Sequence, residues 1–130
     1  MNIHKPFIQI AAILGALSVA LGAFAAHGLK ESVSSDALQI FETGVRYQFY
    51  HVFALAITGI VYGFANVKQA RLAGIFFITG IILFSGSLYA LTFAVNAGNA
   101  GLMKLGIITP FGGVCFILGW IILAFSLAKK

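Results

Sequence analysis

The sequence predicts an all-α membrane protein, a bundle of four transmembrane helices with a short interfacial helix between the first and second spans. Two observations lead to this prediction. The chain has 130 residues, of which 61% are hydrophobic and 8% are charged, and its mean hydropathy is +1.04. Soluble domains carry roughly 25% charged residues, so lipid rather than water is the expected solvent. The apolar residues also gather into four runs of about 20, the length that one helix needs to cross a bilayer.

The four runs are Phe7–Ala26, Val45–Phe64, Leu72–Phe93 and Ile107–Leu127. We expect helices because the backbone amides of a span must be paired within the segment, and no run alternates polar and apolar residues as a barrel strand does. Pro6 suits the start of the first helix, and Thr109 with Pro110 suits the N-cap and first residue of the fourth. The length predicts one integral membrane domain, residues 1–130.

The first run also imitates a signal peptide. Lys5 precedes it, and Ala23-Phe24-Ala25 has the small-x-small pattern of a cleavage site. The run of 20 residues is longer than a signal core of roughly 7–15 residues. We therefore interpret it as a retained helix.

The segment Gly28–Gly44 has the features of a short helix. Ser35 is a suitable N-cap, and Asp36 would lie at the positive end of the helix dipole. Apolar residues then recur at helical spacing, at Leu38, Phe41 and Val45. This helix would lie at the membrane interface before the second span, or be continuous with it.

Basic residues in the flanks of the runs predict the orientation. On the side of the termini lie Lys5, Lys68, Arg71, Lys129 and Lys130, and on the other side lie Lys30, Arg46 and Lys104. By the positive-inside rule, both termini and the turn between the second and third runs are cytoplasmic. The formal charge of +5 has this explanation, so we do not expect nucleic-acid binding.

Polar residues at membrane depth are costly and are therefore candidates for function. At 3.6 residues per turn, one stripe of the second helix and one of the third meet in the outer half of the bundle. The candidate binding site that they indicate consists of His27, Glu42, Arg46, Tyr47, Tyr50, His51, Ser85 and Tyr89.

Each candidate also has a structural interpretation. Glu42 and Arg46 have the i, i+4 spacing of a surface ion pair. The tyrosines suit an interfacial belt, and Ser85 can bond its own helix backbone. His51 can form a hydrogen bond between helices, or serve a ligand or a proton. Small residues on every helix suit internal packing, or contact between copies in a homo-oligomer.

Several classes of chemistry are not expected. Cys115 is the single cysteine, so an internal disulfide is impossible, and His27 and His51 have no third metal ligand at a suitable spacing. The serines have no G-x-S-x-G context, and no acidic residue lies within a span to orient a histidine. We expect no cofactor, and an enzyme is the least favoured class.

Four ordered motifs resemble a known family. They are Leu21–Leu29, Tyr47–His51, Phe84–Tyr89 and Ile108–Gly113. Together they resemble the uncharacterised family called domain of unknown function 423, which includes small bacterial inner-membrane proteins and the animal transmembrane protein 256. The resemblance implies a four-helix protein of the bacterial inner membrane, and it implies no catalytic residue, substrate or cofactor.

Two functions fit these features. In the first, the outer polar cluster binds a membrane lipid or small amphiphile, with Arg46 at a phosphate or carboxylate. The alternative is a proton-linked transporter or channel subunit in which His51 relays protons. A transport path must continue to the inner side, where only Thr58 and Tyr62 extend the polar stripe.

Overall fold

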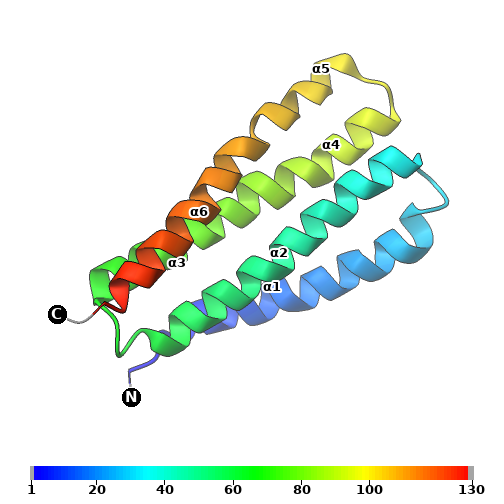
Figure 1. The fold of residues 1–130 in the computed structure, drawn as a ribbon. Helices are drawn as coiled ribbons and strands as arrows, with labels where there is room; N and C mark the ends of the chain where they lie inside the picture. Colours follow the sequence, from blue (N-terminus) through cyan, green and yellow to red (C-terminus); the bar gives the residue numbers. More distant parts are fainter. Residues whose placement is uncertain (1, 129–130) are drawn as a thin grey trace.

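The computed structural model describes residues 2–128. These residues form four long helices that run side by side as two antiparallel hairpins (Figure 1). The segments are, in order, α1 (Lys5–Phe24), η1 (Ala25–Leu29), α2 (Ser35–Val61), α3 (Val67–Gly80), η2 (Ile81–Ser85), α4 (Gly86–Asn96), α5 (Ala100–Met103), η3 (Lys104–Ile107) and α6 (Thr109–Ser126).

The four long helices have two distinct ends. The terminal end holds the start of α1, the end of α6 and the turn at residues 62–66, and the loop end holds the connections at residues 30–34 and 97–99 (Figure 1). The elements α1 and η1 form one continuous helix, as do α3, η2 and α4, and also α5, η3 and α6. The elements η1 and η2 are π-helical turns within their helices.

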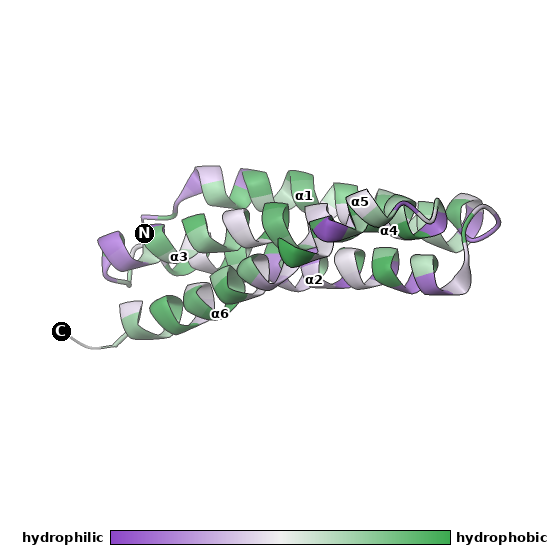
Figure 2. Ribbon diagram, turned by 90° about the horizontal axis from the view of Figure 1, so that it is seen from above, coloured by the Kyte–Doolittle hydropathy of each residue, from purple (hydrophilic) through white to green (hydrophobic). Residues whose placement is uncertain are grey.

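Three helices of the described chain are long and apolar enough to cross a membrane: Lys5–Leu29, Val67–Asn96 and Ala100–Ser126. In Figure 2, α1 and α6 are coloured as hydrophobic along most of their lengths. The remaining long helix, α2, is 27 residues long but carries Arg46, Gln48 and His51 within its first 17 residues. The all-helical architecture is confirmed, and three of the expected spans meet the length and composition of a membrane helix.

The predicted interfacial helix is continuous with α2, since a single helix runs from Ser35 to Val61. The predicted cap at Ser35 is wrong by one residue. Ser34 has extended backbone, and its hydroxyl accepts a hydrogen bond from the N–H of Ala37 at 3.2 Å. Both serines have the right chemistry for a cap, and the backbone conformation selects the first.

The predicted cap at Thr109 is also wrong. The helix α6 begins at Thr109 with Pro110 in its first turn, as expected, but no side chain caps it. The Thr109 hydroxyl instead lies 2.7 Å from the Ser87 hydroxyl on α4. A hydroxyl inside an apolar bundle needs a partner, and the neighbouring helix supplies it.

The helix α2 lies at the centre of the packing. It contacts α1, α3, η2 and α4, while α6 packs chiefly on α3 and η2. The main core cluster includes Phe7, Leu55 and Phe77, all of which are buried. A smaller cluster of Ala25, Leu29 and Phe41 closes the first hairpin near the loop end.

Glycines in α3 and α6 allow the second hairpin to pack closely. A Cβ atom added at Gly112 would lie 2.4 Å from the backbone nitrogen of Phe84, and one added at Gly119 would lie 2.7 Å from the Phe77 ring. Backbones approach each other most closely where no side chain intervenes. Small residues therefore serve internal packing here, whereas Ala12, Ala16 and Ala20 on α1 are exposed.

Candidate functional site

Gln48 joins three helices through its side chain. It is buried on α2, its amide nitrogen donates to the Leu14 carbonyl of α1 at 3.1 Å, and its amide oxygen accepts from the Tyr89 hydroxyl of α4 at 2.8 Å. An unpaired amide at this depth would cost several kcal/mol, roughly 2–7 depending on the reference state. Gln48 thus links the two hairpins at one level of the bundle.

His51 uses both of its ring nitrogens. The indole Nε1 of Trp120 lies 3.2 Å from Nε2, and Nδ1 lies 2.7 Å from the Tyr47 carbonyl oxygen. Indole N–H only donates, so Nε2 is the acceptor and the proton lies on Nδ1, which donates to the carbonyl. The ring also stacks on Phe116, with centroids 3.4 Å apart. His51 is therefore held as a neutral imidazole between α2 and α6.

Ser85 forms a third polar contact between the hairpins. It is fully buried at the end of the π-helical turn η2, and its hydroxyl donates to the Gly44 carbonyl of α2 at 2.7 Å. A π-helical turn shifts the register of the residues around it and often marks a functional position. Here Ser85 bonds across to α2 instead of to its own helix backbone.

The eight predicted site residues fall into two groups. His51, Ser85 and Tyr89 form the interhelical hydrogen bonds described above. The others are exposed on the outside of the described structure: His27, Glu42, Arg46, Tyr47 and Tyr50. Within residues 2–128, no nitrogen of Lys, Arg or His lies within 4.0 Å of a carboxylate, so Glu42 and Arg46 form no ion pair.

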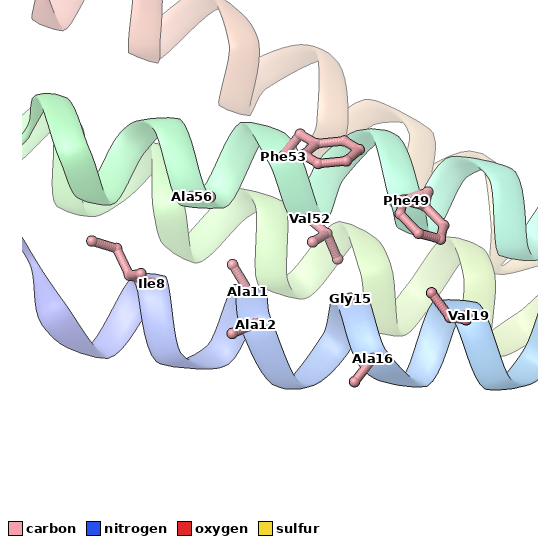
Figure 3. A pocket seen from close by; sticks show the side chains of 10 residues that line it. All are labelled: Ile8, Ala11, Ala12, Gly15, Ala16, Val19, Phe49, Val52, Phe53 and Ala56. Atoms are coloured by element: carbon pink, nitrogen blue, oxygen red, sulfur yellow. The ribbon is translucent and has the colours of Figure 1, made fainter.

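An apolar groove lies between α1 and α2 (Figure 3). Its volume is about 370 Å³, within the range of small-molecule sites. Small residues form much of the α1 wall, and aromatic rings stand on the α2 wall. The lining residues are Ile8, Ala11, Ala12, Gly15, Ala16, Val19, Phe49, Val52, Phe53 and Ala56.

A second hollow, of about 550 Å³, lies at the terminal end between the turn at residues 63–66 and the end of α6. Its lining includes Asn66, Gln69 and Ser126, and the Asn66 backbone N–H donates to the Ser126 carbonyl at 2.8 Å. Neither hollow is lined by any of the eight predicted site residues.

Two residues of the polar network were missed as site candidates. Gln48 was detectable, because an amide in the middle of an apolar run is as costly as a histidine there. Trp120 is half-exposed, and nothing in its own run of apolar neighbours indicates that its N–H meets His51. A metal site is not formed in the described part of the chain, where no three His, Cys, Asp or Glu residues gather.

Three helices that are long and apolar enough to cross a membrane, joined by buried hydrogen bonds, indicate an α-helical membrane protein. The family model "Protein of unknown function (DUF423)" matches residues 21–113. The chain belongs to this family, as its motifs predicted.

Relatives named UPF0382 membrane protein include three from different bacteria. The one from Haemophilus influenzae is 42% identical over 95% of this chain and 94% of its own. The one from Staphylococcus aureus (strain bovine RF122 / ET3-1) is 41% identical over 96% and 97%, and the one from Bacillus subtilis is 39% identical over 96% and 98%. No solved structure matches the chain significantly.

Proposed function

We propose that the protein spans the bacterial cytoplasmic membrane four times, with both termini in the cytoplasm, and binds a membrane amphiphile in the α1–α2 groove. The fourth span is α2. It runs antiparallel between helices that are themselves long enough to cross, and its 27 residues extend for about 40 Å. Between Tyr50 and the terminal end, the outward face of α2 is apolar, with Phe53, Ile57 and Ile60 exposed.

The polar residues of α2 are compatible with such a span. Gln48 and His51 are buried against protein and hydrogen-bonded, so lipid does not meet their polar atoms. A hydrocarbon layer of about 30 Å corresponds to about 20 helical residues. Counted from Tyr62 at the terminal end, that length reaches the region of Glu42, so the exposed Glu42 and Arg46 lie near the outer boundary.

The groove is the single observation on which the binding proposal rests. It opens on the outside of the bundle, and the exposed alanines Ala12 and Ala16 leave room for an acyl chain beside Phe49 and Phe53 (Figure 3). The polar pocket that the sequence indicated in the outer half of the bundle is replaced in this proposal by an apolar groove with polar residues beyond its outer end.

We do not propose the transport alternative, because His51 already has a partner at each ring nitrogen. Thr58, the next polar residue towards the terminal end, donates to the Ala54 carbonyl of its own helix at 2.8 Å. These contacts favour a structural role for the buried stripe.

Filling the groove tests the proposal. The protein is extracted in native lipid particles and the lipid retained after detergent exchange is measured by mass spectrometry. Ala12→Phe places a ring in the groove from the α1 wall, and Ala56→Phe does so from the α2 wall. We expect each to lower the retained lipid severalfold relative to the wild type.

Ala124→Phe is the matched control, because Ala124 is an exposed alanine on α6 outside the groove. It should retain as much lipid as the wild type. Equal retention by the wild type and both groove variants would refute binding at this groove.

A further inference from the structure

We propose that the amphiphile in the α1–α2 groove carries a zwitterionic headgroup, a phosphate followed by a primary ammonium, as in phosphatidylethanolamine. This inference rests on the proposed function, since it names the ligand of the same groove. It follows from the order of chemical groups along the outward face of α2.

The groove itself cannot select among membrane lipids. Its walls are apolar side chains, and lipid tails are as apolar as leucine, so every chain gains equally from it. Selection must come from polar groups at one end of the groove. On α2 the sequence supplies such groups only towards the loop end, where Arg46 and Glu42 are exposed.

The aromatic rings of the groove, the Arg46 guanidinium and the Glu42 carboxylate follow one another along α2. Phe53 and Phe49 stand on the groove wall with ring centroids 5.7 Å apart. Arg46 is three residues before Phe49, about 4.5 Å along the axis, and Glu42 is four residues further, about 6 Å. Helical side chains lean towards the N-terminus, so both reach towards the loop end and the expected membrane surface.

The charges of Arg46 and Glu42 match a headgroup in which the phosphate lies next to the acyl chains and the ammonium lies further out. The Arg46 guanidinium forms no ion pair within the described residues, and its planar donors suit bidentate contact with a phosphate. Glu42, one turn further out, accepts hydrogen bonds from an ammonium and repels a second anionic group. A phosphoglycerol headgroup offers Glu42 no cation, and a choline headgroup offers it no N–H donor.

A competition between defined lipids tests this assignment. The protein is reconstituted in nanodiscs that contain equal amounts of phosphatidylethanolamine, phosphatidylglycerol and phosphatidylcholine with identical chains. Lipids retained after extraction are counted by native mass spectrometry. We expect about fivefold more phosphatidylethanolamine than either competitor, the ratio that a free-energy difference near 1 kcal/mol produces.

Two variants separate the contributions of the two charges. Glu42→Gln should abolish the preference over phosphatidylglycerol, and Arg46→Gln should lower the retention of all three lipids about fivefold. Glu31→Gln and Lys104→Gln are matched controls, because both residues are exposed at the loop end and outside the groove, and neither should change the ratios.

The outcomes distinguish this inference from the proposed function. Preferential retention of phosphatidylglycerol, or an unchanged preference in Glu42→Gln, would overturn the zwitterionic assignment. If Ala12→Phe still displaces lipid in that experiment, the groove remains the binding site. If Ala12→Phe displaces nothing, both the headgroup assignment and the proposed function fail.

Discussion

Substitution of Gly112 by alanine should destabilise the protein, although alanine is the better helix former. The added Cβ would lie 2.4 Å from the backbone nitrogen of Phe84 and 2.7 Å from its Cβ. Ordinary van der Waals contact begins at 3.4 Å. The helix α6 must therefore move away from the continuous helix of α3, η2 and α4 by about 1 Å (3.4 minus 2.4). A backbone nitrogen cannot swing aside as the end of a side chain can.

The magnitude follows from two opposing effects. Overpacking of a close contact costs about 1–3 kcal/mol, because the retreat also opens gaps at neighbouring contacts. Replacing glycine by alanine in a helix contributes about 0.8–1.0 kcal/mol of stability. We therefore expect a net loss of up to about 2 kcal/mol in the free energy of unfolding.

Gly86→Ala provides the matched comparison, since nothing lies within 4 Å of the position of its Cβ. That variant should be more stable than the wild type by about 0.5–1 kcal/mol. The assay is unfolding in mixed detergent micelles, followed by circular dichroism. If Gly112→Ala is as stable as Gly86→Ala, the close approach of α6 to Phe84 is incorrect.

Three further predictions concern the hydrogen bonds and the topology. Tyr89→Phe removes the hydroxyl that donates to the buried Gln48 amide oxygen and should cost about 1–3 kcal/mol. Its effect should be smaller in a Gln48→Leu background, which a double-mutant cycle measures. Trp120→Phe leaves Nε2 of His51 without its donor and should destabilise by about 1–3 kcal/mol in the same unfolding assay, whereas equal stability would contradict the bond. Reporter fusions at the C-terminus and in the turn at residues 97–99 should report opposite sides of the membrane, and the same side for both would contradict the four-span topology.

The helices could be predicted from the sequence because lipid imposes a length and a composition on any span. Each of the four predicted runs lies almost wholly within a helix of the structure, and the family was identified from four short motifs. The caps were less predictable. Ser34 and Ser35 have the same side chain, and only the extended backbone at Ser34 distinguishes the cap.

The site could be predicted only in part, because helical periodicity places residues on a stripe without fixing which helix that stripe faces. The stripe containing His51 was predicted to meet the stripe containing Ser85 and Tyr89. Instead His51 bonds to Trp120 on α6, while Tyr89 bonds to Gln48. The groove depends on the relative rotation of α1 and α2, and small residues such as Ala12 give no sign of whether they face protein or lipid.

The separation of polar groups on α2 explains how one helix can be the least apolar of the four and still suit a membrane. Its buried amide and imidazole cost little in place because each has partners on other helices, so they hold the hairpins in one register. The exposed Arg46 and Glu42 have no such partners among the described residues, so the surrounding lipid or water must satisfy them. Arg46 and Glu42 need not be apolar at this level, because lipid headgroups and water surround the boundary of the membrane. Their presence one turn apart, beyond a groove with no polar wall of its own, is the reason to seek the ligand in the membrane and not inside the bundle.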